Sequence, residues 1–251
     1  MKFFNPNDKQ ESTFDKCMAE YRNLVFGNIS ERVNQLNEHA PNFKPIDFER
    51  EQSVQVGVGE CAFINADTEE RLILGSVGAG TCFILAIVDP NNNSAWLAHI
   101  DVLVSMPQLK EMLTKVFTKI NPNSAVAHIV GGNDSSIVQG IAICNELEKN
   151  GVTISSALLR SKMEMDQLSL AIDPKTGTIY APEANNLKAR NDLWRNLSNR
   201  MTKSNEVGSI GLTEILPLPI ESTSKHYSAP LFETVVYIVI IKCDISGRIV
   251  K

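Results

Sequence analysis

The feature that most constrains the fold is an apolar stretch from Leu72 to Val88, interrupted once by the glycine-rich turn Val77-Gly-Ala-Gly80. The residues on both sides of this turn are apolar and many are β-branched, which is typical of buried strands. A further apolar run, Ala95–Asp101, follows the segment Asp89-Pro-Asn-Asn-Asn93, whose residues favour tight turns. The pattern predicts a strand, a turn and then an antiparallel hairpin.

A cysteine and a histidine lie near the open end of this predicted hairpin. Counted from its turn at Asn91, Cys82 lies nine residues before and His99 eight residues after, so the two should be nearly opposite. An imidazole beside a thiol takes its proton and stabilises the attacking thiolate. The Gly-x-Gly before the cysteine also brings backbone N–H groups that an oxyanion would need. The pattern predicts Cys82 as a nucleophile and His99 as its general base and acid.

Cys82 and His99 could also be structural residues without a catalytic role. A lone cysteine is most often an inert buried thiol, and a histidine on an apolar strand is often a core residue bonded to a carbonyl. Among the other cysteines, Cys144 and Cys243 are expected to be packing residues, whereas Cys61 follows Glu60 and could lie near the site. His128, on another apolar segment, is interpreted as structural.

Two segments around the hairpin resemble those of the bacterial chemoreceptor glutamine deamidases. Ser76-Val-Gly-Ala-Gly-Thr-Cys82 is similar to their Thr-x-Gly-x-Gly-Ser-Cys turn, and the offset of 17 residues from Cys82 to His99 is the same. Gly57-Val-Gly-Glu-Cys-Ala-Phe63 resembles the Gly-x-Gly-Glu-x-Ala-Val segment that opens those enzymes. The resemblance implies a cysteine-deamidase superfamily and a side-chain amide as substrate.

A broader resemblance, from about position 53 onward, is to the eukaryotic-type protein N-terminal asparagine amidohydrolases. Five segments match in the same order; they are Ile73-Leu-Gly-Ser76 with Thr81-Cys82, Ala98-His-Ile-Asp101, Ala127-His-Ile-Val-Gly-Gly132, Leu170–Tyr180 and Tyr227-Ser-Ala-Pro230. This resemblance implies that the substrate is an N-terminal asparagine and that the products are aspartate and ammonia. Hydrolysis by a cysteine and a histidine through a thioester requires no metal and no organic cofactor.

Three further positions bear on catalysis and substrate choice. Ser76 could orient the imidazole or donate to the substrate carbonyl, or it could simply satisfy its own backbone in a turn. A free N-terminal asparagine carries an α-ammonium group, so its pocket should contain a carboxylate near the thiol. Glu60 lies in a segment shared by both families, whereas Asp101 matches only the asparagine family. An exposed strand-end carboxylate is the alternative for Asp101. Gly80 and Thr81 complete the expected substrate contacts, through their backbone.

Strands distributed throughout the chain with helices between them predict a single α/β domain, an antiparallel-rich β-sandwich flanked by helices. A length of 251 residues with 43% hydrophobic residues is sufficient for a sizeable core. We expect a helical N-terminal arm over residues 1–50, in which Ser30 caps a second helix, packed on a domain formed by residues 51–251. A partner-binding or lid segment is the alternative for the arm.

The remaining pattern locates further elements. Strands are expected at 52–58, 71–74, 125–130, 153–159 and 235–241, a hairpin at 168–180, and helices beginning at Pro107, running from a cap at Asp134 to Gly151, and covering 184–201.

Composition restricts the partners and the compartment. The net charge of −5 provides no basic footprint for nucleic acid or for a membrane surface, so a peptide or protein substrate is expected. The five cysteines are scattered without a Cys-x-x-Cys pair, which favours neither a disulfide framework nor a zinc site and fits a reducing cytoplasm. We expect no signal peptide and no membrane span. The sequence does not indicate an oligomeric state.

Three functions are consistent with these residues. The first is an N-terminal asparagine amidohydrolase, the second a deamidase of an internal glutamine or asparagine on a specific partner, and the third a non-catalytic binding protein on the same scaffold.

Overall fold

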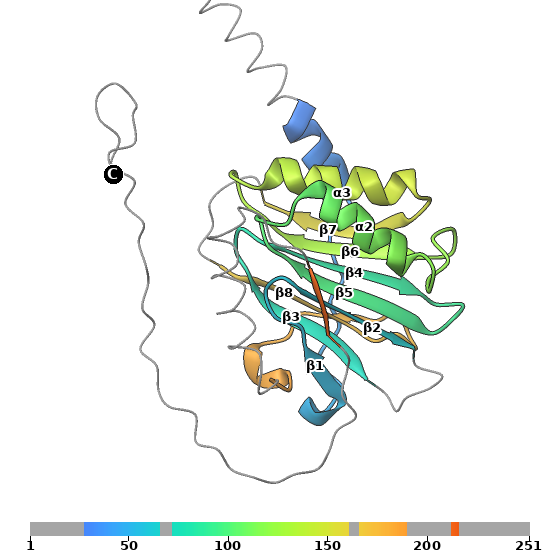
Figure 1. Cartoon of the computed structure of the whole chain (residues 1–251). Helices are drawn as coiled ribbons and strands as arrows, with labels where there is room; N and C mark the ends of the chain where they lie inside the picture. Colours follow the sequence, from blue (N-terminus) through green and yellow to red (C-terminus); the bar gives the residue numbers. More distant parts are fainter. Residues whose placement is uncertain (1–27, 66–71, 161–165, 190–211, 216–251) are drawn as a thin grey trace, which may run out of the picture. The chain divides into compact units, whose positions relative to one another are not determined.

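Two β-sheets stacked face to face form the body of the protein (Figure 1). The computed structural model describes residues 28–65, 72–160, 166–189 and 212–215, all within one unit of the chain, Met1–Leu218. Five of the eight strand pairings in these residues are antiparallel. The structure confirms the predicted α/β class, an antiparallel-rich β-sandwich with helices outside it.

The strands of each sheet come from separate parts of the sequence. The four-stranded sheet has the order β1 (Ser53–Gln55), β3 (Ile73–Ala79), β8 (Leu168–Ile172) and β9 (Ile179–Tyr180). The six-stranded sheet has the order β10 (Thr213–Ile215), β2 (Glu60–Asn65), β5 (Ser94–Ile100), β4 (Phe83–Asp89), β6 (Val126–Gly131) and β7 (Thr153–Leu159).

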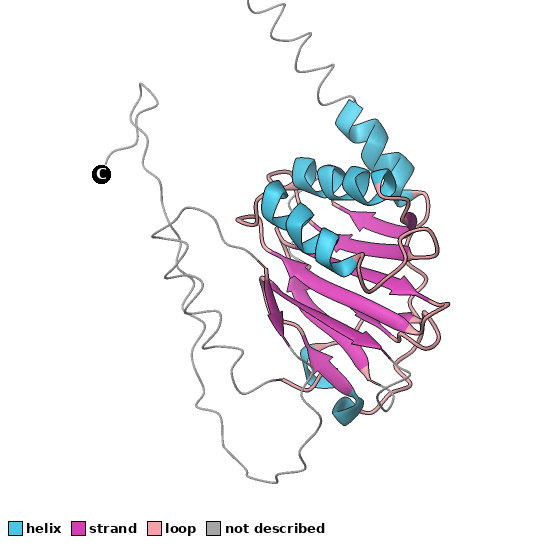
Figure 2. Cartoon of the chain, turned by 45° about the vertical axis from the view of Figure 1, so that its right-hand side comes forward, coloured by secondary structure: helices cyan, strands magenta, loops and turns pink. Residues whose placement is uncertain are grey.

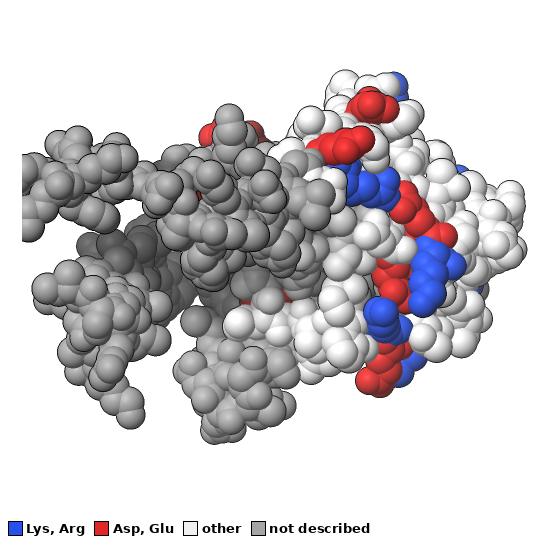
Figure 3. All heavy atoms as spheres, turned by 90° about the horizontal axis from the view of Figure 1, so that it is seen from above, with Lys and Arg blue, Asp and Glu red and all other residues white. Residues whose placement is uncertain are grey.

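Helices cover the outer face of the six-stranded sheet. The helices α2 (Met106–Val116) and α3 (Ile137–Lys149) lie there together with helical residues 28–37, whose Val33 and Leu36 join the same apolar core (Figure 2). Charged side chains of both signs alternate on the solvent side of this layer (Figure 3). They include the ion pairs Arg32–Glu148, Lys110–Glu146 and Lys115–Glu111. Two short 3-10 helices, η1 (Arg50–Gln52) and η2 (Ala184–Asn186), complete the described elements.

The long apolar run of the sequence becomes a strand that is buried on both faces. Every residue of β4 is buried; Phe83, Leu85 and Ile87 pack on the helix side, whereas Ile84, Ala86 and Val88 pack between the sheets. Because neither face of β4 is in contact with solvent, polar and apolar residues do not alternate along it, and the sequence shows a continuous apolar segment.

The chain passes from one sheet to the other at the glycine-rich turn. Strand β3 belongs to the four-stranded sheet, and after Gly80-Thr-Cys82 the chain continues as β4 in the six-stranded sheet. The turn is shorter than the sequence predicted, because β3 continues through Gly78 to Ala79 with a bulge against β8. Gly78 has a φ of +84°, a conformation that favours glycine. The residues of this turn therefore lie at one end of the sandwich, where the sheets are joined.

Several local predictions were wrong. Ser30 does not cap a helix, because helical residues 28–37 already include it. Ser136 rather than Asp134 is the N-cap of α3, since residues 134–136 form a turn in which the Asn133 side chain accepts the Ser135 N–H. The strand expected at 52–58 is reduced to β1 plus an isolated bridge from Val58 to His99.

Other predictions fall partly or wholly outside the described residues. Of the helix expected at 184–201, η2 is the only helical part among residues 184–189, and the rest is not described. The strand expected at 235–241 and residues 1–27 of the arm also lie outside the described part of the chain.

Candidate active site

A buried hydrogen-bonded pair connects the two sheets. Ser76 on β3 and His99 on β5 are both 0% exposed, and the Ser76 Oγ lies 2.8 Å from the His99 Nδ1. Ser76 also donates its hydroxyl hydrogen to the Val56 carbonyl at 2.6 Å. Since a serine has a single hydroxyl hydrogen, its oxygen must accept a hydrogen bond from the Nδ1–H of His99. In the neutral imidazole this places the basic lone pair on Nε2.

Cys82 lies in the bend directly before β4, near the strand position that pairs with His99. The strands β4 and β5 pair with Phe83 opposite Ile100 and Ile84 opposite His99, so Cys82 is two residues away from the residue that faces His99. The sequence predicted a register close to this one, but it placed Cys82 more directly opposite His99. Ile84 lies on the face of His99 between the sheets, and strand alternation carried back from β4 to position 82 would place the Cys82 side chain on that same face. Diagonal neighbours of this kind are roughly 7–8 Å apart between Cα atoms.

Cys82 differs from the other cysteines in its exposure. Among the three cysteines in the described residues, Cys82 is partly exposed, whereas Cys61 and Cys144 are buried. Burial raises the pKa of each of those two thiols to about 12, so they are protonated at neutral pH. Cys61, for which a place near the site was one possibility, packs in the core on the helix side of the sheet, opposite to the face of Ile84. Cys144 is a packing residue, as predicted.

Two glycines allow the end of β6 to approach the backbone of Cys82. The Gly132 N–H donates to the Cys82 carbonyl at 2.9 Å. Gly131 has a φ of +122°, and a Cβ at this position would lie 2.2 Å from the same carbonyl oxygen. A Cβ at Gly132 would lie 2.5 Å from the Phe83 ring. The paired glycines of Ala127-His-Ile-Val-Gly-Gly132 are therefore required for the close packing of β6 against the cysteine.

The two candidate carboxylates have different surroundings. Glu60 is 1% exposed, and its Oε2 accepts the Gly57 N–H at 2.8 Å. The pairing of Cys61 with Ala98 places Glu60 beside His99, on the side of β5 away from β4. Asp101 is half-buried in the loop after β5, where its Oδ1 accepts the Leu103 N–H at 2.9 Å. Both carboxylates thus lie at the end of the sandwich that contains Cys82.

Gly80 and Thr81 form the turn that joins the sheets, and Thr81 is exposed beside the cysteine. Arg160, which sequence analysis did not single out, also belongs to this end of the sandwich. It follows β7, is 6% exposed, and donates to the carbonyl oxygens of Ala79 and Gly80. An arginine after an apolar strand has no sequence signal for such a contact, because its partners lie about 80 residues away.

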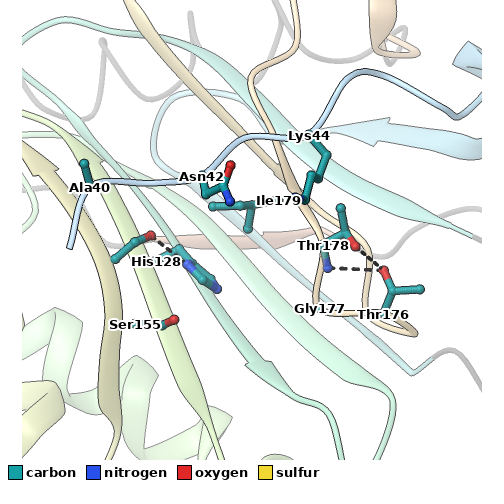
Figure 4. Close-up of a pocket in the computed structure, with 10 residues that line it drawn as sticks. Ala40, Asn42, Lys44, His128, Ser155, Thr176, Gly177, Thr178 and Ile179 are labelled. Carbon is teal, nitrogen blue, oxygen red and sulfur yellow. Dashed lines mark hydrogen bonds between the residues drawn. The ribbon is translucent and has the colours of Figure 1, made fainter.

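A separate cavity of about 310 Å³ lies further along β6 (Figure 4). His128, Ser156 and Thr178 are among its lining residues, and neither Cys82 nor His99 is. The His128 Nδ1 is 2.8 Å from the Ser156 Oγ, and burial lowers the pKa of His128 to about 4. The sequence-based interpretation of His128 as a structural residue agrees with this neutral, hydrogen-bonded imidazole.

Within the described ranges, no group of three or more His, Cys, Asp or Glu side chains could hold a metal ion. No helix in the described part of the chain is long and apolar enough to span a membrane.

The fold and the site together define an α/β sandwich with a Ser–His pair across its two sheets and a partly exposed cysteine two residues before the strand position that pairs with the histidine. The sequence matches the family described as protein N-terminal asparagine amidohydrolase over residues 44–179, more than half of its 251 residues, and the chain belongs to this family. The match includes in full the first three of the five segments that carried the resemblance, and the fourth, Leu170–Tyr180, up to position 179. The fifth, Tyr227–Pro230, lies outside it.

Among solved structures, a Bacillus licheniformis hypothetical protein, YfiH, is 12% identical; the similarity covers 53% of this chain and 70% of that one, with a TM-score of 0.31. A Neisseria meningitidis protein of the DUF152 family is 8% identical; the similarity covers 43% of this chain and 62% of that one, with a TM-score of 0.28. At such low TM-scores neither likeness bears on function. Comparison with curated proteins gives no match.

Proposed function

We propose that the protein hydrolyses the side-chain amide of an N-terminal asparagine, with Cys82 as the nucleophile and His99 as general base and acid. The observation that carries this proposal is the Ser76–His99 pair. Ser76 holds the Nδ1–H of His99, which leaves the Nε2 as the proton acceptor, and Cys82 directly precedes the strand whose Ile84 pairs with His99. The family match supplies the substrate class.

The proposed reaction is an acyl transfer through a thioester on Cys82. The Cys82 thiol gives its proton to the His99 Nε2, and the thiolate attacks the carboxamide carbon to form a C–S bond. Backbone N–H groups of Gly80 to Cys82 stabilise the oxyanion of the tetrahedral intermediate. The C–N bond breaks as His99 gives the proton to departing ammonia. Water, deprotonated by His99, then hydrolyses the thioester to aspartate and the free thiol.

The two carboxylates near the site would select a free N-terminus. The α-ammonium group of the substrate is a cation, and a carboxylate in a partly dehydrated site binds it by a charge-assisted hydrogen bond. Asp101 is half-buried, whereas Glu60 is nearly inaccessible and already accepts the Gly57 N–H. We assign the ammonium contact to Asp101 and a supporting charge to Glu60.

A panel of matched peptides tests the proposal. Peptides that begin with Asn, with Gln or with N-acetylated Asn, and peptides that carry either amide internally, are incubated with the protein and monitored by ammonia release and mass. Only the free Asn-first peptide should be converted to the acid. Cys82→Ala should abolish this conversion, and Cys144→Ala should retain it because Cys144 packs on the helix side.

The other outcomes are equally informative. Conversion of an internal amide at a higher rate would instead indicate a deamidase of folded partners. Absence of any conversion, with binding of the peptide intact, would indicate a binding protein.

A further inference from the structure

Arg160 is held against the crossover between the sheets by an unusual set of partners. Its Nε donates to the Gly132 carbonyl at 3.1 Å, its two Nη2 hydrogens to Ala79 and Gly80 at 3.0 and 2.8 Å, and its Nη1 to the Asp166 carbonyl. Four of the five guanidinium donors are thus used, and their four acceptors are main-chain carbonyl oxygens. A nearly buried guanidinium thus connects the turn before Cys82 to the end of β6, which packs beside Cys82.

These contacts determine the direction of two backbone N–H groups. A trans peptide is planar, with its C=O and N–H pointing in opposite directions. When Arg160 holds the Ala79 and Gly80 carbonyls, it also fixes the N–H groups of Gly80 and Thr81, which belong to the same two peptide units. A donor on the carbonyl also polarises the peptide and strengthens the hydrogen bond that its N–H can donate.

Arg160 also connects the crossover to the glycine pair of β6. Besides its side-chain bond to Gly132, its backbone N–H donates to the Gly131 carbonyl at 3.2 Å. Gly132 in turn donates to the carbonyl of Cys82. One residue therefore fixes the turn before the cysteine and the strand end that packs beside it, and adds a positive charge close to both.

We infer that Arg160 is a positioning residue of the proposed amidohydrolase reaction: it aims the Gly80 and Thr81 N–H groups at the oxyanion and favours the Cys82 thiolate by its charge. The role of Arg160 in aiming the N–H groups at an oxyanion rests on the proposed function. The effect of the Arg160 charge on the Cys82 thiol does not, because a nearby cation favours a thiolate whatever the substrate.

Arg160→Ala and Arg160→Lys separate these two effects. Lysine retains the positive charge but cannot reproduce the planar fork that reaches several carbonyls at once. Both variants should lose about 100-fold in kcat with little change in KM, because the oxyanion forms only after binding. Alkylation of Cys82 by iodoacetamide at neutral pH should slow about tenfold in Arg160→Ala and remain near the wild-type rate in Arg160→Lys. Added guanidinium should restore part of the kcat of Arg160→Ala.

Arg32→Ala is the matched control, because Arg32 pairs with Glu148 on the helix layer. It should leave both kcat and alkylation unchanged. The inference is overturned if Arg160→Ala retains the wild-type kcat and alkylation rate. It is also overturned if both Arg160 variants lose their folded circular-dichroism spectrum, since the residue is then purely structural. If the wild type hydrolyses no amide, the proposed function fails, whereas the alkylation comparison still tests Arg160.

Discussion

At the scale of single residues, the hydroxyl hydrogen of Ser76 decides which nitrogen of His99 is basic. That hydrogen is donated to the Val56 carbonyl, so the serine oxygen can only accept from Nδ1–H. The same contact fixes the ring orientation, because Ser76 and His99 come from different sheets and are both fully buried. Orientation and tautomer of the proposed base thus depend on one hydroxyl group.

Ser76→Ala should therefore lower kcat about 100-fold, because a histidine that is not held in one tautomer is a poor general base. Ser76→Thr retains the hydroxyl and should retain most of the activity. Steady-state kinetics on an Asn-first peptide measures the difference. Equal activity of the alanine and threonine variants would contradict the role of the hydroxyl.

Asp101→Asn isolates the charge of the proposed ammonium contact. The asparagine Oδ1 can still accept the Leu103 N–H, so the turn after β5 is retained. We expect KM for a free Asn-first peptide to rise about tenfold with kcat nearly unchanged, because a charge-assisted hydrogen bond becomes a neutral one. An unchanged KM would remove Asp101 from the binding site and leave Glu60 as the remaining candidate.

At the scale of elements, the site depends on strands that approach one another unusually closely. The end of β6 packs on the Cys82 carbonyl, and this contact excludes a side chain at Gly131, where φ is +122°. The strand pairing then holds Phe83 opposite both Ile100 and Gly131. Backbone contacts among β4, β5 and β6 therefore determine the position of the Cys82 backbone.

Gly131→Ala should reduce the free energy of unfolding by about 3 kcal/mol, because it combines backbone strain with a clash against the Cys82 carbonyl. Gly80→Ala is the matched control for stability, since a Cβ there meets nothing within 4 Å. It should change stability by less than about 0.5 kcal/mol. Denaturant unfolding of both variants measures the contrast, and equal stability losses would contradict the packing described for β6.

At the scale of the whole molecule, sequence patterns located the hairpin because its turn and its two apolar runs are local. The same patterns could not assign Cys61 to a face, because β2 is buried on both sides and alternation does not identify which face holds the site. They also missed Arg160, whose partners are distant in sequence. The Ser76–His99 contact was only one of three alternatives for Ser76, since it joins two sheets whose stacking is not encoded locally.

The buried His128 should make the stability of the whole domain depend on pH. Its folded-state pKa is about 4, below the ordinary 6.5, so the unfolded chain binds the proton more readily. The stabilisation is present above pH 6.5 and is lost as the pH falls toward 4, by about 3 kcal/mol. His128→Gln should remove this part of the pH dependence, whereas replacement of the exposed His39 should not. The free energy of unfolding is measured between pH 7 and pH 4 for the wild type and His128→Gln. The same loss of free energy in both proteins over this range would contradict the prediction.

The most direct test of the central claim is to trap the acyl-enzyme. The protein is mixed with an Asn-first peptide, quenched with acid during turnover and digested for mass spectrometry. We predict that the fragment containing Cys82 carries the substrate, with a mass equal to that of the peptide less ammonia, and that Cys82→Ala gives neither adduct nor product. Turnover by the wild type without any adduct on Cys82, together with an active Cys82→Ala variant, would contradict the account.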